Sequence, residues 1–145
     1  MKTYIRRMTD LDGETLVHLL KRAGEQDPEP NAGFFKDEKN ILLFARTDGH
    51  LSGFLWAYSL ERPGSPYPKM LLYSIDVFPE FRRNGIGTLL IEELKQIARS
   101  RMCREMFVPT SKSNVAAVAL YKSTRGKPEN DDDITFVYDQ DALSN

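Results

Sequence analysis

The sequence predicts one domain of the α/β or α+β class, residues 1–145, with a central mixed sheet flanked by helices. Three observations lead to this expectation. The chain has 145 residues, which suffice for one hydrophobic core and are few for two. Its 41% hydrophobic and 28% charged residues are typical of globular proteins. Finally, apolar segments with strand character alternate with segments of helical spacing, so both hairpin and crossover connections are expected.

The N-terminal third predicts a strand followed by helices. Residues 4–8 read as the first strand. Thr9 and Asp12 have the spacing of a capping box, and leucines at helical intervals follow them. Two prolines and three acidic residues in 25–30 end this helix and form a loop. A second, short helix is expected over residues 32–39.

Two apolar runs, 41–47 and 51–60, predict a β-hairpin. Asp48 and Gly49 separate them, and an Asp-Gly pair tolerates the positive φ values of a tight turn. The next segment, 62–68, contains three prolines. Because proline lacks a backbone N–H group, we expect this segment to be a loop.

The remainder of the chain predicts strands alternating with helices. Residues 70–77 read as a strand, followed by a long helix from about residue 85 to 101 with one apolar face. A short strand over 105–109 and an alanine-rich helix over 114–123 follow. Three aspartates then precede a last strand, which is expected over 134–139.

The composition excludes several kinds of catalytic site. Cys103 is the only cysteine, and His18 and His50 are the only histidines. An internal disulfide, a multi-cysteine zinc site and a three-histidine zinc site are therefore excluded, and no metal centre is expected. Any catalysis is expected to use backbone groups, a tyrosine, carboxylates or a borrowed cofactor.

Charge and hydropathy limit the expected partners and location. Twenty basic residues stand against twenty-one acidic ones, a formal charge of −1, so neither nucleic acid nor an anionic membrane is expected as a partner. No apolar run reaches the roughly 18–20 residues that span a bilayer. The N-terminus becomes polar before a signal-peptide core forms, and we therefore expect a cytoplasmic protein.

The turn before the long helix carries the strongest functional pattern. A helix start presents free N–H groups and the positive end of the helix dipole. Gly85 and Gly87 lack a Cβ atom, so an anion can approach the backbone closely. Arg82 and Arg83 add positive charge, and the Thr88 hydroxyl can donate a hydrogen bond. These residues predict an anion-binding site.

Two familiar phosphate motifs do not fit this turn. A P-loop requires Gly-Lys-Ser/Thr after four spacer residues, and the chain contains no such string. A dinucleotide fingerprint requires a third glycine where this chain has Leu90. The alternative without any ligand is a helix start whose two glycines allow close packing.

The flanking residues resemble a family signature. The pattern Ile75-x-Val77-x-Pro79-x-x-Arg82-x-x-Gly85-x-Gly87 resembles the acetyl-CoA signature of the GNAT acyltransferase superfamily. Downstream, Asn114-x-x-Ala117-x-x-Leu120-Tyr121 is similar to the last helix of that family. The resemblance covers nearly the whole chain. It implies the GNAT fold, with the fourth and fifth strands splayed apart, and acetyl-CoA as the co-substrate.

The resemblance also implies roles for individual residues. Tyr121 would protonate the leaving thiolate as a general acid, and a backbone N–H near Val77 would polarise the acetyl carbonyl. Arg125 departs from the family pattern, which usually has glycine at that position. The implied cofactor-binding residues are Ile75, Asp76, Val77, Arg82, Arg83, Asn84, Gly85, Ile86, Gly87, Thr88, Asn114 and Ala117.

The residues leave the general base undecided. Asp76 is a candidate base or water-positioning group, and Ser74 is a candidate water-positioning group. Glu61 and Glu80 are further carboxylates that could serve. Solvated carboxylates at a strand end and in a turn are the alternative explanation for Asp76 and Glu80.

The C-terminal residues 126–139 suggest which amine would accept the acetyl group. Residues 126–139 resemble the C-terminal region of the aminoglycoside 3-N-acetyltransferase branch, and acids lie in this tail and in 25–29. They suit a small polycationic amine, such as an aminosugar or a polyamine. Acetylation of a protein or peptide is the alternative within enzymes, and a catalytically inactive CoA-binding sensor is the alternative outside them. Homodimers are common among similar proteins, but nothing in the sequence defines an interface.

Overall fold

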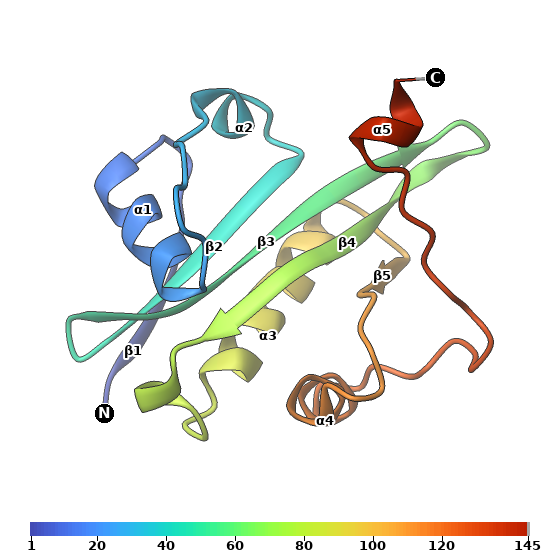
Figure 1. Cartoon of the computed structure of the whole chain (residues 1–145). Helices are drawn as coiled ribbons and strands as arrows, with labels where there is room; N and C mark the ends of the chain where they lie inside the picture. Colours follow the sequence, from blue (N-terminus) through green and yellow to red (C-terminus); the bar gives the residue numbers. More distant parts are fainter. Residues whose placement is uncertain (145) are drawn as a thin grey trace.

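Five strands form one sheet with helices on both faces in the computed structural model, which describes residues 1–144 (Figure 1). The elements are β1 (Thr3–Arg7), α1 (Gly13–Arg22), α2 (Ala32–Lys36), β2 (Asn40–Thr47), β3 (His50–Arg62), β4 (Ser65–Val77), a 3₁₀ turn (Pro79–Phe81), α3 (Ile86–Ser100), β5 (Glu105–Phe107), α4 (Val115–Ser123) and α5 (Gln140–Leu143). No helix within residues 1–144 has the length and apolar character to cross a membrane.

The strands lie in the order β1-β2-β3-β4-β5. The first four pair antiparallel with their neighbours, whereas β4 and β5 run parallel and are joined by the crossover helix α3. The predicted class, a central mixed sheet flanked by helices, is therefore confirmed.

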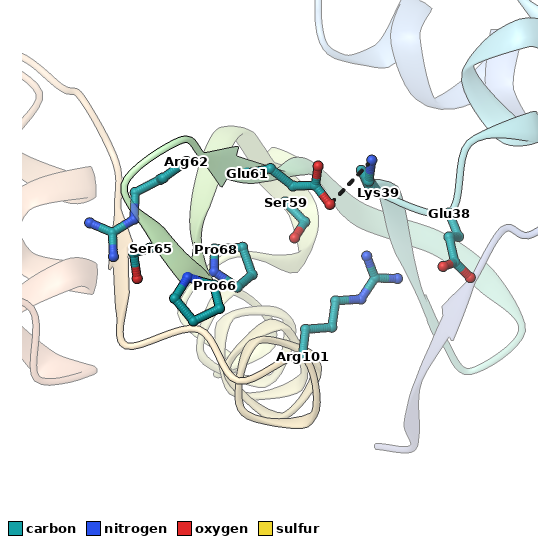
Figure 2. A pocket seen from close by; sticks show the side chains of 9 residues that line it. All are labelled: Glu38, Lys39, Ser59, Glu61, Arg62, Ser65, Pro66, Pro68 and Arg101. Atoms are coloured by element: carbon teal, nitrogen blue, oxygen red, sulfur yellow. Dashed lines mark ion pairs between the residues drawn. The ribbon is translucent and has the colours of Figure 1, made fainter.

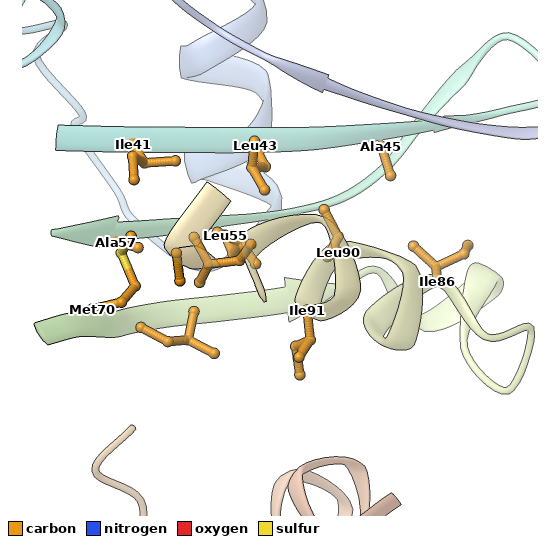
Figure 3. Packing of buried hydrophobic residues seen from close by; sticks show 12 residues of the cluster. Ile41, Leu43, Ala45, Leu55, Ala57, Met70, Ile86, Leu90 and Ile91 are labelled. Atoms are coloured by element: carbon orange, nitrogen blue, oxygen red, sulfur yellow. The ribbon is translucent and has the colours of Figure 1, made fainter. Parts of the chain in front are cut away.

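The larger hydrophobic core lies between the sheet and α3. Side chains alternate between the two faces of a strand, and Ile41, Leu43 and Ala45 of β2 point toward α3 (Figure 3). The other buried members of this cluster come from β3, β4 and α3: Leu55, Ala57, Met70, Leu72, Ile86, Leu90, Ile91, Leu94 and Ala98.

A second core lies on the opposite face of the sheet, under α1 and α2 (Figure 1). Leu16 and Leu19 bury one face of α1 against Leu42 and Phe54 of the sheet, and Phe78 closes the cluster at the end of β4. The sheet thus separates two sides of the molecule, and the end of β4 contributes to both.

The helix cap differs from the prediction in its position. Asp12, not Thr9, is the N-cap residue of α1, and its carboxylate accepts hydrogen bonds from the Thr15 backbone N–H at 3.1 Å and the Thr15 hydroxyl at 2.7 Å. One residue thus satisfies an N–H group that the helix start leaves free.

The loop predicted over residues 62–68 is wrong, because β3 and β4 form one long hairpin. The turn is confined to Pro63 and Gly64, and Arg62 already pairs with Ser65. Pro66 and Pro68 lie within β4, before its pairing with β5 begins at Lys69. This part of β4 is an edge strand, where a missing N–H group breaks no ladder.

The strand predicted over residues 134–139 is also wrong. The segment is extended but pairs with no strand within residues 1–144, and the short helix α5 follows it. A segment becomes a β-strand only when its backbone pairs with a neighbouring strand, and side chains with a preference for strands do not provide that neighbour.

Candidate active site

The C-terminal half of β4 has a free edge. Only three residue pairs join β4 to β5, and the last of these is Leu71 with Phe107. Beyond it β4 continues to Val77 without a neighbour on that side, among residues 1–144. This divergence is the expected splay of the fourth and fifth strands. The unpaired N–H and C=O groups of residues 72–77 can accept an extended ligand as an added strand.

A β-bulge decides which side of the sheet each residue of this segment faces. Trp56 pairs with Ser74 and Ala57 with Leu72, so Tyr73 is the extra residue. After the bulge, Ile75 packs against the core under α3.

The polar residues of the segment face the other side. Ser74 and Asp76 lie opposite Trp56 and Phe54, which belong to the cluster under α1 and α2. Directly paired residues share a face of a sheet, so the two candidate polar groups point toward the α1–α2 side.

The turn after β4 leads into a helix start that no side chain caps. Gly85 is the N-cap residue of α3, with φ 77° and no side-chain hydrogen bond to the first turn. A Cβ atom at Gly85 would meet nothing within 4 Å. No side chain therefore accepts from the first N–H groups of α3, at Ile86, Gly87 and Thr88, and such uncapped groups can bind an anion.

The side chains of Arg82 and Asn84 form contacts within this turn and stabilise its shape. The Arg82 Nε donates to the Val77 carbonyl at 2.8 Å, and its guanidinium lies 3.6 Å from the Asp76 carboxylate. The Asn84 amide donates to the Phe81 carbonyl at 3.1 Å. By contrast, Arg83 is exposed, at a positive φ of 63°. Both arginines are exposed, but Arg83 forms no side-chain hydrogen bond or ion pair with the residues that the structure describes.

Glycines near this site permit close approaches between elements. A Cβ atom at Gly87 would lie 3.0 Å from a methyl group of Leu120, so Gly87 lets α4 pack tightly on α3. In β3, a Cβ atom at Gly53 would lie 2.7 Å from the Asp76 carbonyl oxygen. The sequence alone does not predict this role of Gly53, and the only signal for it is a glycine inside an apolar strand pattern.

Tyr121 lies on α4 and is half buried against the core that also contacts Ile75 and Val77. Burial raises the pKa of the Tyr121 phenol, so that it stays protonated at neutral pH. Asn114 begins the same helix, and its side-chain oxygen accepts a hydrogen bond from the Ala117 N–H at 3.2 Å. The cap of α4 therefore holds Asn114 and Ala117 together.

Arg125 takes the place of the usual glycine without disrupting the end of α4. It adopts the left-handed conformation, with φ 77°, which a glycine there would also supply. The N–H group of Gly126 donates to the Tyr121 carbonyl at 2.7 Å, and the Thr124 hydroxyl donates to the Leu120 carbonyl at 2.9 Å. The last carbonyl groups of the helix are thus satisfied.

The candidate carboxylates differ in their surroundings. Burial raises the pKa of Asp76 above its usual range, and the charge of Arg82 opposes this rise. Glu80 is exposed and pairs with Arg22, whose hydrogen bond holds the pKa of Glu80 below its usual range. Of these two groups, Asp76 has the pKa better suited to accept a proton near neutral pH.

Glu61 lies at the other end of the sheet and does not join the site. It forms an ion pair with Lys39 at 3.5 Å beside a cavity of about 490 Å³ (Figure 2). Arg101 extends into this cavity from the end of α3 (Figure 2). The other residues that line it are Glu38, Ser59, Arg62, Ser65, Pro66 and Pro68. None of the residues that line this cavity belongs to the β4–α3 turn.

Other reactive side chains are poorly placed for catalysis. Cys103 packs beside the core. Burial raises the pKa of its thiol and so disfavours the thiolate form. His18 and His50 are exposed on α1 and at the β2–β3 turn. Among residues 1–144, no three His, Cys, Asp or Glu side chains gather closely enough to hold a metal ion.

The site combines an open strand edge with an uncapped helix start, which suits a long ligand with an anionic end. A model of the acetyltransferase (GNAT) family matches residues 5–126 of the chain. The chain belongs to the GNAT acetyltransferase family. The family match ends just after α4, so the segment from residue 127 onward lies outside it.

Individual relatives resemble this chain to different extents. Mycothiol acetyltransferase of Salinispora arenicola is 36% identical over 87 residues, which are 59% of this chain and 28% of that protein. The N-alpha-acetyltransferase RimI of Mycobacterium tuberculosis is 32% identical over 100 residues, 67% of this chain and 60% of the relative. The chain therefore spans less than two thirds of the length of either relative.

The solved structure of AAC(6')-Iy, in complex with a bisubstrate analog, CoA-S-monomethyl-acetylneamine, is similar with a TM-score of 0.78 at 21% identity. The similarity covers 97% of this chain and 99% of that chain. At this identity it shows the fold, and it agrees with the GNAT fold expected from the two sequence motifs.

Proposed function

We propose that this GNAT protein is an N-acetyltransferase that transfers an acetyl group directly from acetyl-CoA to a primary amine of a small polycationic acceptor. The observation that carries the proposal is the free edge of β4 at residues 72–77, which leads straight to the uncapped start of α3. The geometry suits the two parts of CoA, since an extended pantetheine arm needs a strand edge and a pyrophosphate needs free N–H groups.

Cofactor binding uses mostly backbone groups in this proposal. The edge of β4 at Ile75, Asp76 and Val77 pairs with the pantetheine arm. The N–H groups of Ile86, Gly87 and Thr88 bind the pyrophosphate. The exposed Arg83 adds charge, whereas Arg82, Asn84 and Gly85 set the shape of the turn. On α4, Asn114 and Ala117 border the arm.

Direct transfer to an amine needs a neutral nucleophile, a stabilised oxyanion and a proton for the leaving sulfur. Acetyl-CoA supplies the activated acetyl thioester. The Val77 N–H group stabilises the negative charge that develops on the carbonyl oxygen. Tyr121 donates a proton to the departing thiolate as the carbon–sulfur bond breaks. Asp76 accepts the proton that the amine loses as the carbon–nitrogen bond forms, directly or through a water that Ser74 holds.

The α1–α2 side of the sheet supports a cationic acceptor. Ser74 and Asp76 face this side. The exposed loop that joins α1 to α2 contains three acids, Glu25, Asp27 and Glu29. Beside Ser74 in β4, Tyr73 is 59% exposed, and its ring stacks on Trp56 with centroids 5.6 Å apart. Carboxylates and aromatic faces are the groups that attract ammonium ions in water.

An acceptor panel tests the proposal. The chain is incubated with acetyl-CoA and aminoglycosides, polyamines or peptides with a free N-terminus, and free thiol is measured. Thiol release with aminoglycosides or polyamines, at least ten times that with peptides, is the expected result. A preference for peptides would support the alternative of protein or peptide acetylation. Binding of CoA without thiol release for any amine would contradict an enzyme and support the CoA-binding sensor.

A further inference from the structure

Helix α4, which carries Tyr121, has little buried surface of its own. None of its residues, Val115–Ser123, is fully buried, and it lies at the margin of the molecule beside α3 (Figure 1). Every residue from 125 to 144 is exposed, so the segment that follows the helix adds no buried residue. Because so little burial fixes α4, its position depends on particular contacts with α3.

Contacts at two places along α3 hold α4. Near the start of α3, the Leu120 side chain packs over Gly87. About two turns later along α3, the Lys95 ammonium donates a hydrogen bond to the Thr124 carbonyl oxygen at 2.6 Å. Tyr121 lies between Leu120 and Thr124 in the sequence, so the two contacts bracket the residue that carries the phenol.

The Lys95 side chain is well held for this bond. It is 23% exposed, and its ammonium also donates to the Glu92 carboxylate at 3.1 Å. A hydrogen bond from a charged donor is stronger than one between neutral groups. A cation near the last carbonyl groups of a helix also complements the helix dipole. Lys95 therefore binds the end of α4 both through a hydrogen bond and through its charge.

Thr124 connects this bond to the backbone of Tyr121. Thr124 is 4% exposed, and its hydroxyl lies 2.9 Å from the Leu120 carbonyl oxygen and 3.1 Å from the Tyr121 carbonyl oxygen. The Gly126 N–H group donates to the same Tyr121 carbonyl at 2.7 Å. A series of hydrogen bonds thus runs from Lys95 on α3 to the backbone of Tyr121.

The bonded carbonyl also belongs to the peptide group that leads into Arg125. Arg125 adopts a left-handed conformation, which is unfavourable for a residue with a Cβ atom. The peptide group between Thr124 and Arg125 is held on both sides, its carbonyl by Lys95 and its N–H by the Lys122 carbonyl at 3.1 Å. Lys95 therefore stabilises a turn that this chain forms without glycine.

We propose that Lys95 is a positioning residue for the Tyr121 phenol. It fixes the C-terminal end of α4 to α3, whose start binds the pyrophosphate, and so sets the place of the phenol relative to the thioester sulfur. This role rests on the proposed function, in which Tyr121 protonates the leaving thiolate. Burial accounts for the raised pKa of the phenol, so Lys95 acts on its position rather than on its acidity.

Steady-state kinetics with acetyl-CoA and the best acceptor of the panel test this role. Lys95→Met keeps the aliphatic stem and removes the donor and the charge. We expect kcat to fall about 10- to 100-fold, because small displacements of a catalytic group are this costly, while the Kd for CoA changes less than about threefold. Lys95→Arg can donate to the same carbonyl and should keep kcat within about threefold of the wild type.

The matched control lies one turn further along α3. Arg99→Met removes a cationic side chain that is exposed and forms no hydrogen bond or ion pair with the residues that the structure describes, so it should keep the wild-type kcat. A loss of kcat in this control equal to that in Lys95→Met would overturn the specific role of Lys95.

A double-mutant cycle with Tyr121→Phe separates positioning from a general loss of structure. Once the hydroxyl is gone, Lys95→Met should lower kcat by less than about twofold. Equal losses in both backgrounds, or a wild-type kcat for Lys95→Met, would overturn the role of Lys95 and leave the proposed function intact. A wild-type kcat for Tyr121→Phe would instead contradict the acid role of Tyr121, and the role of Lys95 with it.

Hydrogen exchange supplies a readout that needs no turnover. The Gly126 N–H group, which donates to the Tyr121 carbonyl, should exchange about tenfold faster in Lys95→Met than in the wild type or Lys95→Arg. The amides of α1 should exchange at the same rate in all three proteins. An unchanged rate at Gly126 in Lys95→Met would overturn the positioning role, whether or not the chain acetylates an amine.

Discussion

The Tyr121 phenol is the side chain on which the proposed chemistry depends most. Burial raises its pKa, so it holds its proton until a stronger base, such as a leaving thiolate, develops nearby. Tyr121→Phe keeps the ring that packs against the core and removes only the hydroxyl. We expect a loss of about 10²–10⁴-fold in kcat, with the Kd for CoA nearly unchanged. A variant within threefold of the wild-type rate would remove Tyr121 from the mechanism.

Asp76 should determine how the reaction rate falls on the acidic side of the pH profile. A base works only when deprotonated, so the rate should fall as the pH drops through the pKa of Asp76, which burial places above the ordinary carboxyl range. Asp76→Asn should remove this fall and lower the rate throughout. Glu80→Gln is the control, because Glu80 is exposed and forms an ion pair with Arg22. This variant should keep the wild-type pH profile.

Arg82 offers a further check on the same carboxylate. Its positive charge, 3.6 Å from Asp76, lowers the pKa of that group. Arg82→Gln should therefore move the fall in rate to higher pH, as followed by kcat at saturating acetyl-CoA. A shift to lower pH would show that another group titrates.

The contact between α3 and α4 sets the position of Tyr121. A methyl group at Gly87 would lie 3.0 Å from Leu120, the neighbour of Tyr121 on α4, so α4 must move by a few tenths of an ångström. We expect Gly87→Ala to lower kcat by about tenfold or more. The melting temperature should change little, because alanine is more favourable than glycine in a helix by about 1 kcal/mol, which offsets the cost of moving α4. Gly13→Ala in α1 is the control, because its Cβ meets Pro30 at an ordinary 3.8 Å.

The elements that sequence patterns predict well are those whose signals are local. Two glycines and the apolar face of α3 lie within one continuous stretch, and the structure places the uncapped helix start there. Gly53 is different, because its role depends on the carbonyl of Asp76 in the neighbouring strand. The β3–β4 hairpin cannot be predicted locally for a related reason, since Pro66 is acceptable only where β4 has a free edge.

At the scale of the whole molecule, the sheet divides the proposed work between its two faces. The α3 side holds the cofactor turn and Tyr121, and the α1–α2 side receives Ser74 and Asp76. The splay of β4 from β5 opens the edge between these sides, so donor and acceptor can meet at the end of β4. This topology could be predicted only through the family resemblance, because strand neighbours are not visible in a single sequence.

The fold also explains why the chain needs few reactive side chains. Backbone N–H groups bind the phosphates and stabilise the oxyanion in the proposed mechanism, and the thioester arrives already activated. Cys103, the only thiol, packs beside the core, where burial disfavours its thiolate form. The central claim is therefore direct transfer from acetyl-CoA to an amine.

The stoichiometry of acetyl transfer tests this claim most directly. Acetyl-CoA labelled in the acetyl group is incubated with the chain, with and without the best acceptor of the panel. CoA, acetylated amine and the intact mass of the protein are then measured together. Direct transfer predicts one CoA for each N-acetylated amine, no burst of CoA without acceptor, and no label on the protein. A burst of CoA in the absence of amine, matched by acetyl label on the chain, would contradict it.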